Sequence, residues 1–218
     1  WKELGPLKID TITAHHSVGM GWVSDIYVSP IDTNILYLGS KSGGFWKSLD
    51  GGLTWQVTTD FLHATGVNTI AVSPTNTDSI LINIQSAKSS SDITGGASHG
   101  IYRSTDGGNT WTLTNFNPLF VMNFPFRIQQ ITYHPLVSNL IFILTTNGLF
   151  RSDDNLNTWS LVSTVISDSW GSWSSQIEFH PTDPNIIYSH SYSNNGSLHV
   201  SNDMGFTFSN ISLPSYIN

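Results

Sequence analysis

Short apolar segments recur along the whole chain, and turn residues separate each one from the next. Four of these segments end beside a proline: DIYVSP at Pro30, TIAVSP at Pro74, QITYHP at Pro135 and QIEFHP at Pro181. Each is followed by a polar turn and a second apolar segment, and the second segments read NILYLGS, SILINIQ, NLIFILT and NIIYSHS. Alternating or short apolar segments bounded by turn residues predict β-strands, and no part of the chain predicts a helix.

Two further segments complete each unit. The third reads GGFWKS, HGIYRS, NGLFRS or GSLHVS, and the fourth follows the next Trp or Phe. Four short strands per unit, repeated along a chain, are typical of the blades of a β-propeller. The sequence therefore predicts an all-β fold, a β-propeller with four-stranded antiparallel blades, with blade units at approximately residues 22–62, 66–117, 127–164 and 173–213.

The first residues of the chain predict one strand more than four blades need. Residues 1–6, WKELGP, match the fourth-strand pattern of WQV, WTL and WSL. We therefore expect residues 1–6 to form the outer strand of a preceding or closing blade. This predicts a propeller of about six to eight blades, of which the chain is a part continuous with further blades or domains.

The composition excludes several classes of function. Only 11% of the 218 residues are charged and the net charge is −7, whereas a protein that follows a phosphate backbone needs a basic stripe. We therefore expect no nucleic acid partner. No apolar run is long enough to span a membrane as a helix, which predicts no direct membrane insertion. The absence of cysteine rules out disulfides and thiolate metal sites.

A motif with the pattern Ser-x-Asp-x-Gly-x-Thr-Trp occurs once in each unit, between the third and fourth strands. It resembles the Asp-box, also called the bacterial neuraminidase repeat. An Asp in such a turn can accept hydrogen bonds from backbone amides, and glycine allows positive φ. Two copies depart from the pattern, with Leu156 in place of glycine and Phe208 in place of tryptophan. We expect a structural role for these residues, rather than catalysis or metal binding: Ser48, Asp50, Gly52, Trp55, Ser104, Asp106, Gly108, Trp111, Ser152, Asp154, Trp159, Ser201, Asp203, Gly205 and Phe208.

Two enzyme families share this resemblance. Sialidases hold a carboxylate with three arginines, but two of the arginines here, Arg103 and Arg151, occupy equivalent repeat positions, so no triad is expected. The repeats also resemble xyloglucanase-type and sortilin-type propellers, and residues 19–50 are similar to the first blade of xyloglucan-hydrolysing glycosidases. Where those enzymes carry a catalytic Asp, this chain has Lys41. A glycosidase needs paired carboxyl groups, and the remaining candidates, Asp25, Asp168 and Glu178, form no pair by spacing.

Aromatic and basic residues gather before the first strands of the units. In a propeller the second-to-third connections and the blade-to-blade connections emerge on one face, which we call the top face, and the Asp-box turns emerge on the other. When the first strands are aligned, one repeat position is occupied by Trp22, Gly66, Arg127 and Trp173. The tryptophans at this position could bind a ligand, or they could pack between adjacent blades. The predicted ligand-binding residues are Trp170, Trp173, Trp22, Arg127 and Asp25.

These observations favour a non-catalytic β-propeller module that binds a glycan or protein partner through its top face. By resemblance it belongs to a secreted or cell-surface bacterial protein, an adhesin-like or secreted multidomain protein. We expect no cofactor and no metal. Two alternatives stay open: a xyloglucanase-like glycoside hydrolase whose catalytic carboxylates lie partly outside this segment, and a structural or assembly subunit of a surface complex.

Overall fold

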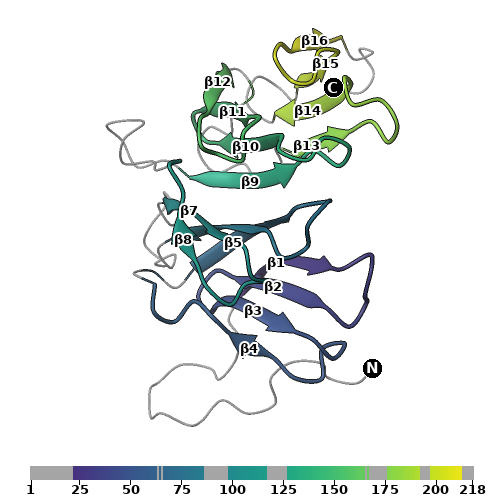
Figure 1. Cartoon of the computed structure of the whole chain (residues 1–218). Coiled ribbons are helices and arrows are strands. Elements are labelled where there is room, and N and C mark those ends of the chain that lie inside the picture. The colour runs from purple at the N-terminus through teal and green to yellow at the C-terminus, as the bar shows by residue number, and fades with distance from the viewer. Residues whose placement is uncertain are drawn as a thin grey trace.

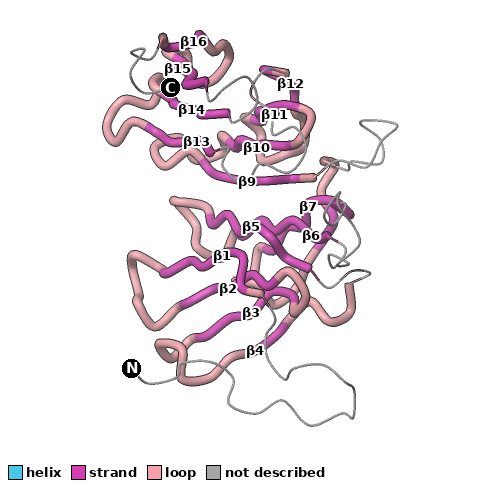
Figure 2. The backbone as a smooth tube through the Cα atoms, turned by 180° about the vertical axis from the view of Figure 1, so that it is seen from behind, coloured by secondary structure: helices cyan, strands magenta, loops and turns pink. Residues whose placement is uncertain are grey.

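A computed structural model describes residues 22–62, 64, 66–85, 98–116, 127–164, 166, 176–191 and 197–212 of the chain. The described residues form four antiparallel sheets of four strands, and the strands of each sheet are neighbours in the order of the chain. Figure 1 shows the four sheets arranged one after another, and Figure 2 shows the same order from behind. The prediction of an all-β fold built from four-stranded antiparallel units is confirmed. The predicted outer strand at residues 1–6 lies outside the described residues.

The sheets are named blade one to blade four in chain order. Blade one contains β1 (Val23–Val28), β2 (Leu36–Ser40), β3 (Gly44–Ser48) and β4 (Gln56–Val57). Blade two contains β5 (Gly66–Val72), β6 (Ile80–Gln85), β7 (Ser98–Ser104) and β8 (Thr112–Leu113). Blade three contains β9 (Ile128–Tyr133), β10 (Ile141–Thr145), β11 (Gly148–Ser152) and β12 (Ser160–Ser163). Blade four contains β13 (Gln176–Phe179), β14 (Ile187–Ser191), β15 (Ser197–Ser201) and β16 (Ser209–Ile211).

The residue before each strand-ending proline closes the turn between the first and second strands. In blade one the Ser29 hydroxyl accepts a hydrogen bond from the Asp32 amide (3.3 Å), and in blade three His134 Nδ1 accepts one from the Leu136 amide (3.1 Å). His180 Nδ1 accepts likewise from the Asp183 amide (3.0 Å). The histidines at these positions therefore act as turn acceptors, the role that serine has in blade one.

The hydrophobic core lies between the blades. One buried cluster joins blades one and two, including Tyr37 and Phe45 with Ile82 and Trp111. A second joins blades two and three, and a third joins blades three and four. Each sheet has apolar residues on both faces, since each interior face packs against the next blade. The outward face of β1 is the exception, because Ile26 is 60% exposed.

Candidate functional site

The four Asp-box turns share one hydrogen-bond pattern. In blade one the Ser48 hydroxyl donates to Asp50 Oδ1 (2.8 Å) and accepts from the Gly52 amide (2.8 Å). Asp50 also accepts from the Thr54 amide (2.8 Å) and the Thr54 hydroxyl (2.6 Å). These bonds, first those from Thr54, lower the pKa of Asp50 to about 2. The carboxylate is therefore fully engaged within its own turn.

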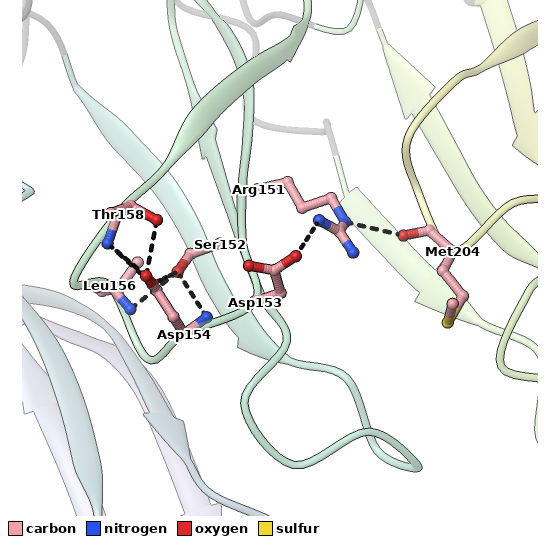
Figure 3. Close-up of polar contacts among 7 residues, drawn as sticks. All are labelled: Arg151, Ser152, Asp153, Asp154, Leu156, Thr158 and Met204. Atoms are coloured by element: carbon pink, nitrogen blue, oxygen red, sulfur yellow. Dashed lines mark hydrogen bonds and ion pairs between the residues drawn. The ribbon is translucent and has the colours of Figure 1, made fainter.

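The same bonds recur in the other blades, even where the glycine is missing. In blade three the Ser152 hydroxyl donates to Asp154 and accepts from the Leu156 amide (2.9 Å), while Thr158 donates to Asp154 through its amide and hydroxyl (Figure 3). Asp106 and Asp203 hold their turns through Thr110 and Thr207. The structure thus uses these carboxylates to fix turns, which leaves them poorly placed for acid–base chemistry.

A basic residue before the Asp-box serine reaches the next blade. Arg151 Nε donates to the Met204 carbonyl in the Asp-box turn of blade four (3.1 Å), and its guanidinium bonds Asp153 (3.1 Å; Figure 3). Lys47 likewise donates to the Gly107 carbonyl in the Asp-box turn of blade two (3.5 Å). Met204 and Gly107 are the residues directly after the Asp of their motifs. These cations link the turns of neighbouring blades, which is a role that the sequence analysis did not assign to them.

A second series of contacts joins the first strands. Asp25 Oδ2 accepts from the Ile70 amide (2.7 Å), the Thr69 hydroxyl accepts from the Ile131 amide (3.2 Å), and Gln130 Oε1 accepts from the Ile177 amide (3.0 Å). In each case a side chain of one blade satisfies the backbone of the next. The sequence contains a pattern that could have indicated these contacts, because the residue before the aligned isoleucine can accept a hydrogen bond in every repeat.

Asp25, predicted to bind ligand, lies in this contact between blades one and two. Its second carboxylate oxygen accepts from the Ile26 amide (2.9 Å), so both oxygens are occupied. Burial raises the pKa of Asp25, and the bonds from Ile70, Ile26 and Thr69 counteract part of that rise. These contacts give Asp25 a role in joining two blades, while its role in ligand binding stays a prediction.

Trp22 lies on the top face directly before β1, and its side chain is 61% exposed. Its carbonyl accepts a hydrogen bond from the Lys41 amide (2.9 Å), which joins it to the end of β2. The Lys41 ammonium nitrogen lies 4.5 Å from the centroid of the Trp22 ring, within cation–π range. This pair presents an aromatic surface beside a positive charge, at the position where the resemblance to glycosidases implies a catalytic Asp.

Arg127 stands at the Trp22 position of blade three. Its amide donates to the Thr146 hydroxyl (3.2 Å), and its carbonyl accepts from the Thr146 amide (3.0 Å). The equivalent residue of blade two, Gly66, is buried, and no side chain fits there because a Cβ would lie 2.6 Å from the Lys41 carbonyl oxygen. Trp22 and Arg127 thus belong to the top face but lie two blades apart.

Two of the predicted ligand-binding residues, Trp170 and Trp173, lie outside the described residues. The same holds for Asp168 and for most of the two long connections predicted to carry specificity. Among the residues that the structure describes, no three His, Asp or Glu side chains are arranged to hold a metal ion. No helix long and apolar enough to cross a membrane occurs in the described ranges.

The chain is similar to known xyloglucanases in sequence and in fold. It is 36% identical over 108 residues to a xyloglucanase from a Paenibacillus species, and 31% identical over 118 residues to one from Hypocrea jecorina. These alignments cover 43% and 46% of this chain but only 10% and 14% of the two relatives.

Solved structures extend the likeness to nearly the whole chain. The crystal structure of the GH74 xyloglucanase from Xanthomonas campestris matches with a TM-score of 0.69 and 19% identity, covering 89% of this chain and 31% of that one. At this identity the match shows the fold, which is that of a β-propeller of which the chain spans a part. The family model Sortilin-Vps10, described as sortilin, neurotensin receptor 3, matches residues 99–216. This match covers more than half of the chain, which therefore belongs to the Sortilin-Vps10 family.

Proposed function

We propose that the chain is part of a non-catalytic β-propeller that binds a glycan through its top face. The observation that carries the proposal is the exposed Trp22 ring with the Lys41 ammonium beside it. An exposed indole offers an apolar face on which a sugar ring can stack, and an ammonium offers donors to sugar oxygens. The xyloglucanase relatives support a polysaccharide as the ligand class.

The carboxylates argue for binding without hydrolysis. A glycosidase uses two carboxyl groups on either side of the scissile bond, and a lysine cannot replace one of them. On the top face of blade one, Lys41 stands where the relatives are expected to carry the catalytic Asp, and both oxygens of Asp25 are bonded to amides. The competing proposal is a glycoside hydrolase whose catalytic carboxylates lie partly outside this segment.

A protein or peptide ligand is the second candidate. It is favoured by membership of a family whose description names a receptor. The same exposed Trp22 suits such a ligand, since tryptophan is enriched among the residues that dominate protein interfaces. For either ligand we propose a secreted or cell-surface location, in keeping with the low proportion of charged residues.

The test is a binding and hydrolysis assay with the full-length protein. Xyloglucan oligosaccharides and cello-oligosaccharides are titrated by calorimetry, and release of reducing ends is followed in parallel. We expect binding without hydrolysis, and we expect Trp22→Ala to weaken binding by about tenfold, as loss of a stacking residue does. The control is Leu136→Ala, which removes an exposed apolar side chain from the Asp-box side of blade three. Equal binding by Trp22→Ala and the parent would reject this face, and release of reducing ends would favour the hydrolase.

A further inference from the structure

Three large aliphatic side chains are exposed on the Asp-box side of blade one. Ile31 is 82% exposed, Leu49 is 63% exposed and Leu53 is 68% exposed. Ile31 lies in the turn between β1 and β2, and the two leucines flank Asp50 in the turn between β3 and β4. Single exposed apolar residues are ordinary, but several in one place mark an interaction surface.

The two turns lie side by side. The Gly51 amide donates to the Asn34 carbonyl (2.9 Å), and the strands that lead into the turns pair at Leu36 and Ser48. Both views of the backbone show the β1–β2 and β3–β4 turns next to each other at the same end of the blade (Figures 1 and 2). The three aliphatic residues therefore form one surface, which we call the blade-one patch: Ile31, Leu49 and Leu53.

Blade two shows that the turns do not require aliphatic residues at these positions. In blade two the three equivalent residues are all polar: Thr75, Thr105 and Asn109. That blade has the same hydrogen bonds around Asp106 as blade one has around Asp50. Since the turns form equally well with polar residues, the aliphatic residues of the blade-one patch have no role in closing them.

Two carboxylates adjoin the blade-one patch. Asp32 lies next to Ile31 in the sequence, and Asp50 lies next to Leu49. Lys47 is the cation closest in sequence, but it is 6% exposed and donates to Gly107 and to Asn109 Oδ1. The rim of the patch is therefore acidic.

We infer that the blade-one patch binds a protein segment that carries aliphatic anchors flanked by lysine or arginine. Aliphatic side chains of the partner cover Ile31, Leu49 and Leu53, and its cations face Asp32 and Asp50. Such charge complementarity speeds association and selects the partner, while the apolar centre supplies the affinity. This surface is on the opposite side of the propeller from Trp22, so it is independent of the proposed glycan site.

The test uses the full chain and a fluorescently labelled peptide of leucine and lysine, with a leucine and glutamate peptide of the same length as its counterpart. The variant Ile31→Thr/Leu49→Thr/Leu53→Asn introduces the residues of blade two, so the turns are expected to close normally. Leu136→Thr is the matched control, because Leu136 occupies the Ile31 position of blade three and is also exposed. Melting temperatures of all variants report on folding.

We expect the lysine peptide to bind, the triple variant to weaken its binding by at least about tenfold, and Leu136→Thr to leave it unchanged. Asp32→Asn should weaken binding and reduce its dependence on salt. Equal binding of the glutamate peptide, or equal loss of binding in Leu136→Thr, would overturn the inference. Binding to phosphatidylcholine vesicles that is lost in the triple variant would assign the patch to a lipid surface instead.

Discussion

At the scale of single residues, Leu156 shows that side chains of the neighbouring blade determine which residues can occupy the glycine position of the Asp-box. It adopts a positive φ (63°) that leucine rarely adopts, at a position where the other three copies have glycine. A Cβ at Gly108 would lie 2.7 Å from the Phe45 ring of blade one. Blade two has Ile101 at the Phe45 position, and Leu156 is buried in the same cluster as Ile101. The sequence shows that Leu156 departs from the motif. Whether a side chain fits at this position depends on the residue that the preceding blade places beside it, which no local pattern reports.

The depressed pKa of Asp50 predicts that its contribution to the stability of the fold depends on pH. Its folded pKa, about 2, lies below the ordinary value of an unfolded Asp, about 3.9. A depressed carboxyl pKa stabilises the fold above the unfolded value, and this stabilisation is lost as the pH falls through the folded value. We therefore expect the difference in melting temperature between the parent and Asp50→Asn to be constant above about pH 5 and to shrink between about pH 4 and pH 2.

The comparison is made by thermal unfolding from neutral to acid pH. Asp60→Asn serves as the control, because Asp60 is exposed in the turn after β4 of the same blade. A difference for Asp50→Asn that stays the same at the acid and neutral ends would contradict the prediction.

At the scale of strands and turns, the pattern of apolar residues predicted each element but not the contacts that hold the blades together. Alternation and the prolines were sufficient to place the four strands of each unit. The side-chain bonds from Asp25, Thr69 and Gln130 connect residues far apart in the chain, and no local pattern reports such partners. Asp25 illustrates this limit, because a carboxylate before a strand looks the same in sequence whether it faces solvent or a neighbouring blade.

Thr69 tests the value of one contact between blades. Thr69 and Ile131 are both buried, and the Thr69 hydroxyl accepts a hydrogen bond from the Ile131 amide in blade three (3.2 Å). Thr69→Val keeps the shape of the side chain but removes the acceptor of the buried Ile131 amide, and it also removes the hydrogen bond from Thr69 to Asp25 of blade one. We expect the free energy of unfolding to fall by about 1–3 kcal/mol, the cost of such a group.

Denaturant unfolding of Thr69→Val measures this cost. Thr112→Val is the matched control, since the exposed Thr112 hydroxyl donates only to the Arg103 carbonyl across the strand pair (3.3 Å). If both variants lose the same small amount, the bond between blades contributes nothing beyond an exposed hydrogen bond.

At the scale of the whole molecule, the internal repeats made the architecture predictable and left the ligand undefined. Four copies of one motif are enough to identify a propeller, because each copy marks the same turn of the same unit. A ligand depends on what the loops of several blades bring together on one face. Trp22 and Lys41 are brought together by the structure, whereas the long connections that distinguish the blades are the part of the chain where sequence patterns are weakest.

The outward face of β1 gives a prediction about the rest of the propeller. Ile131 and Ile177 are each 2% exposed because a preceding blade covers them, whereas Ile26, at the same repeat position, is 60% exposed. In the chain of 218 residues, Ile131→Thr should therefore lower the free energy of unfolding by about 2–4 kcal/mol, because it places a polar group in a packed core. Ile26→Thr should change it by less than about 0.5 kcal/mol, as surface substitutions do.

In a longer polypeptide in which a further blade covers β1, Ile26→Thr and Ile131→Thr should lower the free energy of unfolding by similar amounts, because Ile26 then has the surroundings of Ile131. Denaturant unfolding of both variants in both lengths of chain makes the comparison, with sedimentation to establish that the shorter chain is a monomer. A large cost for Ile26→Thr in the monomeric shorter chain would mean that this face is already covered without another blade. A negligible cost in the longer chain would mean that the next blade does not pack on β1 as β9 packs on blade two.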